Sequence, residues 1–120
     1  MGLDMYLYLE DKETSEIIEY SYYRKFNALQ GYFVRNFDIP NCGRVGLDHE
    51  TIEEVYQLLN EVRYDREKAG ALMPAFPGPF FGSYDYDRIY HGYIDQAAAD
   101  FYHAKFLDFN KYNLFYTSNW

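Results

Sequence analysis

The sequence predicts an α+β fold in which about three helices pack on a small antiparallel sheet. Two observations lead to this class. Residues of strand type gather at both ends of the chain, and the middle carries apolar residues at three- and four-residue spacing. This segregation argues against a doubly wound parallel sheet. With 120 residues the chain is long enough for one domain, residues 1–120, and too short for two.

The first residues predict a β-hairpin, and the last predict a strand that completes the sheet. Residues 3–9 and 16–22 are the two hairpin strands, and the polar residues 11–15 form the turn between them. Alternation in the first strand puts four apolar side chains on one face, namely Leu3, Met5, Leu7 and Leu9. The opposite face carries Asp4, Tyr6, Tyr8 and Glu10. Residues 112–118 are the closing strand.

The first two predicted helices follow the hairpin. An apolar stripe over residues 23–36 predicts the first, with Ser21 as its N-cap and an end before Pro40. The second runs from an N-cap at Asp48 to residue 63. Between them, residues 44–47 are expected to add a short strand.

The clearest helical spacing lies in residues 85–108, which predict a long third helix. Asp85 and Asp87 lie at its start, where carboxylates can accept hydrogen bonds from the first free amide groups and are stabilised by the positive end of the helix dipole. Before it, residues 66–72 suggest a helical turn, and residues 73–82 form an apolar loop broken by Pro and Gly. Such a loop either folds over the core or binds a partner, and the first is the expectation.

Net charge restricts the partners that the chain can have. The formal charge is −8, so a nucleic-acid backbone would be repelled and direct nucleic-acid binding is not expected. An acidic surface either keeps a protein in solution or attracts a basic protein surface. The 15 tyrosines allow two interpretations as well: a tyrosine-rich core, which is the expectation, or a tyrosine-rich binding face.

Enzyme motifs are missing from the sequence. No serine lies in a nucleophile motif, and no glycine-rich phosphate loop is present, so no catalytic residue is assigned. The start of the chain has neither a signal peptide nor a membrane span, and a soluble cytoplasmic protein is expected.

A zinc site is the one metal hypothesis that the residue types allow. Asp4, Cys42 and His49 offer a carboxylate, a thiolate and an imidazole, which are zinc ligands. The expected alternative for the single cysteine is a small buried apolar residue, because no paired-ligand motif accompanies it.

Several stretches together resemble a family of small proteins encoded by phages and prophages of low-GC Gram-positive bacteria. They are residues 1–8, Tyr22–Lys25 with Asn27, Cys42-Gly43, residues 80–83 with Tyr86-Asp87, and residues 116–120. The resemblance covers nearly the whole chain. In that family a histidine often stands where this chain has Gln30, so a family metal site using that histidine would not carry over.

A small acidic phage-type protein rich in tyrosine also resembles the anti-CRISPR proteins. The resemblance implies an inhibitor, not an enzyme, that binds a type II CRISPR effector nuclease in the host bacterial cytoplasm and blocks loading of target DNA into its basic channel. The carboxylates expected to contact the nuclease are Glu10, Asp11 and Glu13 in the hairpin and Glu50, Glu53 and Glu54 in the second helix. A small zinc-dependent enzyme and a phage protein that modulates another host target are the alternatives.

Overall fold

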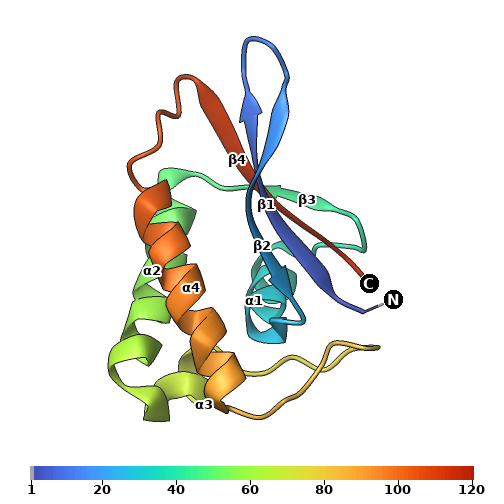
Figure 1. The fold of residues 1–120 in the computed structure, drawn as a ribbon, viewed down its shortest axis with the longest axis vertical. Helices are drawn as coiled ribbons and strands as arrows, with labels where there is room; N and C mark the ends of the chain where they lie inside the picture. The colour runs from blue at the N-terminus through green and yellow to red at the C-terminus, as the bar shows by residue number, and fades with distance from the viewer. Residues whose placement is uncertain (1) are drawn as a thin grey trace.

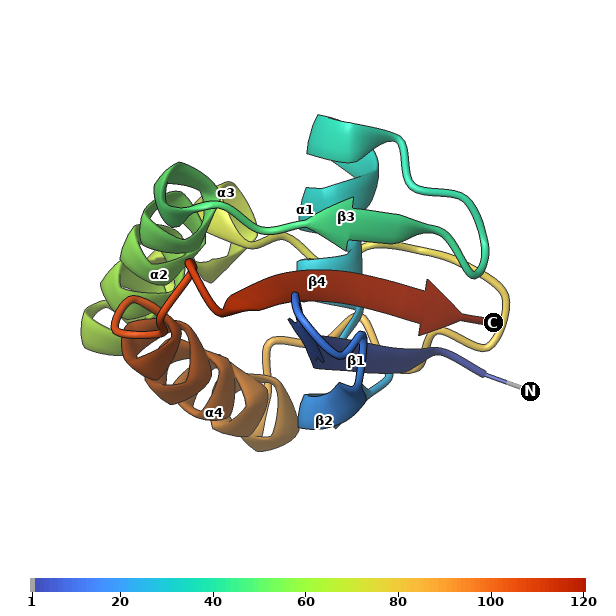
Figure 2. The ribbon, with the colours of Figure 1, turned by 90° about the horizontal axis from the view of Figure 1, so that it is seen from above.

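A computed structural model describes residues 2–120 and confirms the α+β class (Figure 1). Its centre is a four-stranded antiparallel sheet with the strand order β2-β1-β4-β3. The helices gather on one side of this sheet, and Figure 2 shows the four strands lying side by side. The buried apolar side chains form one continuous cluster between the sheet and the helices.

The two central strands come from opposite ends of the chain. β1 (Asp4–Asp11) pairs with β4 (Tyr112–Asn119) along its full length, from Asp4 opposite Asn119 to Asp11 opposite Tyr112. β2 (Ile17–Arg24) and β3 (Arg44–Gly46) are the two edge strands. The predicted hairpin, short strand and closing strand are therefore confirmed, with small shifts at their ends.

Alternation along the central strands separates the two faces of the sheet. Met5 and Leu7 of β1, and Leu114 and Tyr116 of β4, are buried against the helices. The residues between them point to the other side, which no helix formed by residues 2–120 covers (Figure 1). Antiparallel sheets commonly bury one face and leave the other in water. This uncovered side is called the open face below.

Three helices longer than two turns pack on the buried face, namely α1 (Asn27–Phe37), α2 (His49–Tyr64) and α4 (Arg88–Ala104). A 3₁₀ turn η1 (Arg66–Lys68) and a single-turn helix α3 (Ala69–Leu72) follow α2, as the sequence suggested. α2 and α4 lie against each other. The predicted cap of α2 is confirmed, because the Asp48 side chain accepts a hydrogen bond from the Thr51 amide at 2.8 Å.

The first helix starts later than the predicted residue 23, because β2 continues to Arg24. Tyr23 pairs with Met5 of β1, and its ring is fully buried. The chain turns at Lys25, where φ is 57°, and Phe26 then precedes α1 without a side-chain cap. Ser21 was predicted to cap this helix, but it lies inside β2 and bonds to α4 instead.

Asp100 fastens α4 to the edge strand β2. The hydroxyls of Ser21 and Tyr23 both donate to its Oδ2 at 2.5 Å, and the Tyr20 hydroxyl donates to its main-chain oxygen at 3.0 Å. Hydrogen bonds to a carboxylate are stronger than those between neutral groups. They fix the position of α4 on the sheet.

The third helix is shorter than the predicted 85–108. It begins at Arg88, and the Asp87 side chain caps it by accepting the Tyr90 amide hydrogen at 3.0 Å. Asp85 therefore lies outside the helix and is exposed. The helix ends at Ala104, after which residues 105–111 turn back toward β4.

The apolar loop folds over the core at two points and is pinned by a buried asparagine. Met73 and Phe81 are buried, whereas Phe80 is 63% exposed. The Asn27 side chain, itself 4% exposed, accepts from the Phe76 amide at 2.9 Å and donates to the carbonyl oxygens of Phe81 and Ser83. One side chain therefore holds three separate points of the loop.

Replacing Asn27 with Ala should lower the free energy of unfolding by roughly 2 kcal/mol, because it leaves buried main-chain groups without partners. Urea unfolding measures this. Asn36→Ala is the matched control, since Asn36 is exposed and its side chain bonds only within α1. Equal effects of the two substitutions would show that Asn27 does not hold the loop.

His91 should make stability depend on pH. Burial lowers the pKa of His91 below the ordinary histidine value of 6.5, and the charge of Arg66 lowers it further, against weaker opposing effects of Asp95 and Asp87. The unfolded chain therefore takes up a proton first as the pH falls below about 6.5, which favours unfolding until the folded protein is protonated as well.

The measurement is urea unfolding between pH 7.5 and 4.5 for the wild type and for His91→Gln. The loss of stability below about pH 6.5 should be smaller in the variant. His103→Gln is the control, because His103 is exposed on the same helix. Parallel pH profiles of wild type and His91→Gln would contradict the assignment.

Candidate functional site

The open face carries a row of aromatic side chains. Tyr6 stacks on Tyr8 with ring centroids 5.4 Å apart and an angle of 11° between the planes. Tyr22 of β2 flanks Tyr6 at 5.2 Å, and Phe115 of β4 flanks Tyr8 at 5.5 Å. The row thus crosses three strands, and aromatic pairs at such separations attract each other. Tyr22 is exposed and Tyr6 and Tyr8 are half-buried, whereas Phe115 is only 6% exposed, so the three tyrosines form most of the surface that meets solvent.

Charged side chains lie at both ends of the aromatic row. At the β3 end, the Arg44 guanidinium lies 4.4 Å from the centroid of the Phe115 ring, which is a cation–π arrangement. At the β2 end, Asp4 Oδ1 accepts from Arg24 at 2.8 Å and from the Tyr22 hydroxyl at 2.6 Å. The Tyr22 hydrogen bond and the charge of Arg24 lower the pKa of Asp4. Asp4 is therefore both on the open face and held by donors.

Protonation of the tyrosines follows from their surroundings. Burial raises the pKa of Tyr8, and the neighbouring Tyr6 and Glu19 raise it further. The hydrogen bond to Asp4 raises the pKa of Tyr22. Both phenols therefore stay neutral and able to donate hydrogen bonds well above neutral pH.

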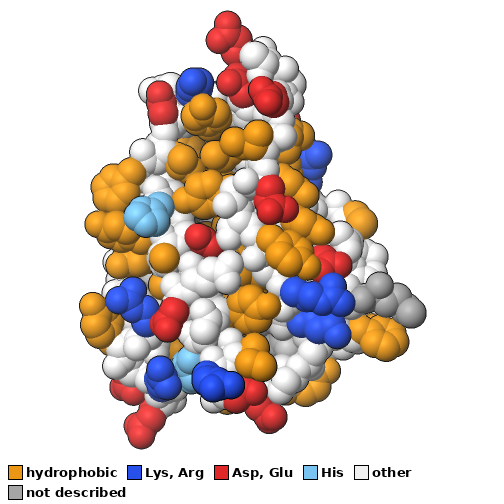
Figure 3. All heavy atoms as spheres, viewed as in Figure 1, with side chains coloured by type: hydrophobic (Ala, Val, Ile, Leu, Met, Phe, Trp, Pro, Cys, Tyr) orange, Lys and Arg blue, Asp and Glu red, His pale blue; other side chains and the backbone are white. Residues whose placement is uncertain are grey.

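The hairpin end of the sheet is rich in carboxylates. Glu13, Glu16 and Glu19 are exposed, and Glu10 is half-buried beside them on β1. Figure 3 shows acidic side chains clustered at the tip of the molecule, where Figure 1 places the turn between β1 and β2. Within residues 2–120 three ion pairs form, and none of them involves a carboxylate of this hairpin end.

Asp11 differs from the other hairpin carboxylates because it builds the turn. Its Oδ1 accepts the amide hydrogens of Glu13 at 2.8 Å and Thr14 at 3.1 Å. These bonds, with the Thr14 amide the larger contributor, lower the pKa of Asp11. Asp11 shapes the acidic tip, so replacing it would disturb the turn as well as the charge.

The three predicted contacts on α2 have different surroundings. Glu53 accepts from Gln57 at 2.8 Å and pairs at 3.2 Å with Lys105, which directly follows α4, and these two partners lower its pKa. Glu54 is exposed and lies near Tyr32, whose pKa is raised to about 12 mainly by burial and then by Glu54. Glu50 is exposed in the first turn of α2. Glu53 is thus the least available of the three.

A groove of about 500 Å³ lies where the open face meets the start of α2. Glu10, Lys12, Arg44, His49 and Phe115 are among its lining residues, so it brings together two predicted site residues, Glu10 and His49. The His49 ring lies edge-on to the Phe109 ring, 4.7 Å away. Neither Arg44 nor Phe115 was predicted, although alternation with Leu114 and Tyr116 already places Phe115 on the open face.

The predicted zinc ligands do not meet. The Cys42 amide bonds to the carbonyl oxygen of Ser118, near the end of β4, whereas His49 follows Leu47, whose amide bonds to Leu114. Among residues 2–120 no three His, Cys, Asp or Glu side chains form a group that could hold a metal ion. Asp4, Cys42 and His49 therefore occupy separate places.

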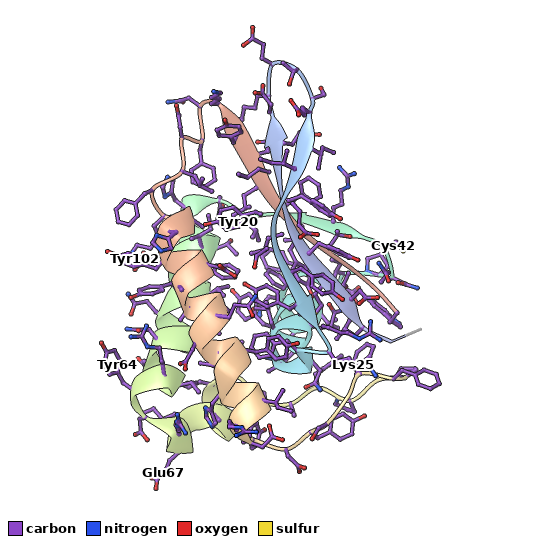
Figure 4. The ribbon with its side chains drawn as sticks, viewed as in Figure 1. Tyr20, Lys25, Cys42, Tyr64, Glu67 and Tyr102 are labelled. Atoms are coloured by element: carbon purple, nitrogen blue, oxygen red, sulfur yellow. The ribbon has the colours of Figure 1, made fainter. Side chains whose placement is uncertain are left out.

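Cys42 was expected to be a small buried residue, and this is wrong. It is exposed in the turn before β3, with φ at 63° (Figure 4). The turn is closed by a hydrogen bond from the Gly43 amide to the Pro40 carbonyl oxygen at 2.9 Å. Turn residues lie at the surface because their main-chain groups need water or local partners.

The chain matches no protein-family model, no curated protein and no solved structure. No helix in the described part of the chain has the length and apolar character to cross a bilayer.

The Asp4 cluster can be tested directly by carbon-detected NMR titration of the side-chain carboxyl groups. The pKa of Asp4 should lie below 3.8, and Tyr22→Phe should raise it, because that substitution removes the largest stabilising contact of the carboxylate. Tyr6→Phe is the control, since Tyr6 touches the Tyr22 ring. An Asp4 pKa that is the same in wild type and Tyr22→Phe would contradict the assignment.

Proposed function

We propose that this chain acts by binding a basic, nucleic-acid-binding protein surface, and that the partner is a type II CRISPR effector nuclease. The observation that carries the proposal is the acidic hairpin end beside the aromatic row of the open face. In this proposal the protein works in the cytoplasm of a bacterial host. It occupies the basic channel and keeps target DNA out, without chemistry of its own.

The two parts of this surface have different roles in binding. Carboxylates of the hairpin end steer the encounter with a basic surface, because opposite potentials raise the association rate. The aromatic row then supplies contact area, since Tyr and Phe are enriched in the desolvated centres of interfaces. The net charge of −8 adds long-range attraction and also prevents the chain from binding DNA itself.

The size of the surface explains why both parts are needed. The three eight-residue strands are roughly 27 Å long, and the sheet with the three-residue β3 spans roughly 15 Å, so the open face covers at most about 400 Å². A stable interface buries about 800 Å² on each partner. The hairpin end and the adjoining groove must therefore contribute as well.

The first test is DNA cleavage by a guide-loaded type II CRISPR nuclease, with and without this protein, together with a gel shift of the target DNA. The proposal expects cleavage and DNA binding to fall together as the protein is added. The inhibition should weaken at high salt, because exposed charges are screened beyond about 10 Å at 0.1 M. Unchanged cleavage across several such nucleases would contradict the proposal.

Charge reversal at the hairpin end tests which surface binds. The variant Glu10→Lys/Glu13→Lys/Glu16→Lys should weaken binding at least about tenfold, since close interfacial charge pairs contribute more than 1 kcal/mol each. The measurement is the affinity for the nuclease by surface plasmon resonance.

The matched control is Glu61→Lys/Glu67→Lys/Asp95→Lys, which changes the net charge equally at exposed positions on α2, η1 and α4. This control should keep most of the affinity. Equal loss in both triple variants would mean that only total charge matters and that the hairpin end is not the contact surface.

A further inference from the structure

A second cavity lies away from the groove, where the end of β2, the start of α1 and the start of α4 meet. Its volume is about 280 Å³, and its wall includes Lys25, Phe26 and Asn27 on one side and the segment from Gly82 to Asp87 on another. Figure 4 labels Lys25 at the end of β2, above the loop that leads to α4. Three elements that are distant in sequence thus enclose one space.

The floor of this cavity is aromatic and held in place. The Phe26 and Tyr93 rings are stacked with centroids 5.3 Å apart and planes at 16°, and Tyr90 meets Phe26 edge-on at 6.2 Å. The Tyr90 hydroxyl donates to the Met73 carbonyl oxygen at 2.7 Å. Asn27 fixes the loop on the opposite side through its bonds to Phe81 and Ser83. The cavity is therefore preformed, as small-molecule sites usually are.

Two cations, Arg24 and Lys25, belong to the wall of the cavity. A Cβ atom placed on Gly2 would lie 3.0 Å from Lys25 Cε and 3.5 Å from Arg24 Nη2, so both side chains approach Gly2. Asp4 balances Arg24, but Lys25 belongs to none of the three ion pairs between described residues. This side therefore has a positive charge available for an anionic group.

The backbone around the cavity is shaped to place Lys25. Lys25 has φ at 57°, a conformation that glycine adopts more readily. The main chain is therefore strained at the residue whose side chain lines the cavity. Gly82 has φ at 88°, and a Cβ there would come within 3.0 Å of Lys25 Cβ. Gly82 therefore lets the Lys25 side chain lie along the loop.

Carboxylates line another part of the same cavity. Asp85 is exposed, and Asp87 uses one of its oxygens, Oδ1, to cap α4 at Tyr90. A ligand ammonium group could be accepted there. The cavity thus combines an aromatic floor with a cation and carboxylates at its rim.

We propose that this cavity binds a free aromatic amino acid. The carboxylate of the amino acid would face Lys25, and its ammonium group would face Asp85 and Asp87. Its ring would pack on the aromatic floor. The volume lies at the lower limit of ligand sites, roughly 300 Å³, which suits a single amino acid better than a nucleotide. The two rim carboxylates would also repel a phosphate chain. The inference does not depend on the proposed function, because the open face plays no part in it.

The experiment is a titration of the full chain with L-phenylalanine, followed by amide NMR shifts. Saturable shifts are expected at residues 25–27 and 82–90, with a dissociation constant in the millimolar range or below. N-acetyl-L-phenylalanine and L-phenylalanine methyl ester each lack one charge and should bind at least about fivefold more weakly. No saturable shift, shifts confined to other residues, or equal binding of either derivative would overturn the inference.

Two substitutions test the rim. Lys25→Gln and Asp85→Asn should each weaken L-phenylalanine binding by at least about fivefold, since each removes one charged contact. Lys68→Gln is the control, because Lys68 lies in η1 outside the cavity. Asp85 is exposed and outside regular structure, so Asp85→Asn keeps the test decisive if Lys25→Gln does not fold. Wild-type affinity in Asp85→Asn would overturn the inference.

Discussion

The rest of the fold is built on the pairing of β1 with β4. These strands come from the two ends of the chain, yet they pair in register along the whole of β1 and form the centre of the sheet. Register decides which side chains meet the helices, because a slip of one residue would turn every side chain to the other face. Met5, Leu7, Leu114 and Tyr116 reach the core only in the observed register. Everything between the two strands must fold so that they can meet.

The same pairing creates the surface that we propose for binding. When Leu7 and Tyr116 face the core, Tyr6, Tyr8 and Phe115 must lie on the open face, and they come into contact there. The tyrosine-rich core and the tyrosine-rich binding face were alternatives in the sequence, and the strands contain both. Tyr23 and Tyr116 are buried, while Tyr6 and Tyr22 are accessible. Alternate residues of the same strands therefore supply the core on one face and the accessible surface on the other.

Features that depend on local spacing were predictable, and features that depend on distant contacts were not. Alternation in β1 and the Asp48 cap were visible in the sequence and are confirmed. The start of α1 was misplaced, because pairing with β1 and the bond from Tyr23 to Asp100 keep residues 23–24 in a strand. Glu53 is not free to bind a partner because Lys105, which directly follows α4 and is distant in sequence, pairs with it. The zinc hypothesis joined residues by type alone, and chain geometry keeps Cys42 and His49 apart.

The hairpin end and the open face together are the contact surface that we propose. Hydrogen–deuterium exchange of this chain, alone and with a guide-loaded type II CRISPR nuclease, tests it most directly. Binding through this surface should slow exchange in the nuclease complex at the turn of residues 11–16, at the edge strand β3 and at the first turn of α2 beside the groove, with the rest of α2 and α4 unchanged. Slower exchange confined to α2 and α4, with the hairpin turn unchanged, would contradict it.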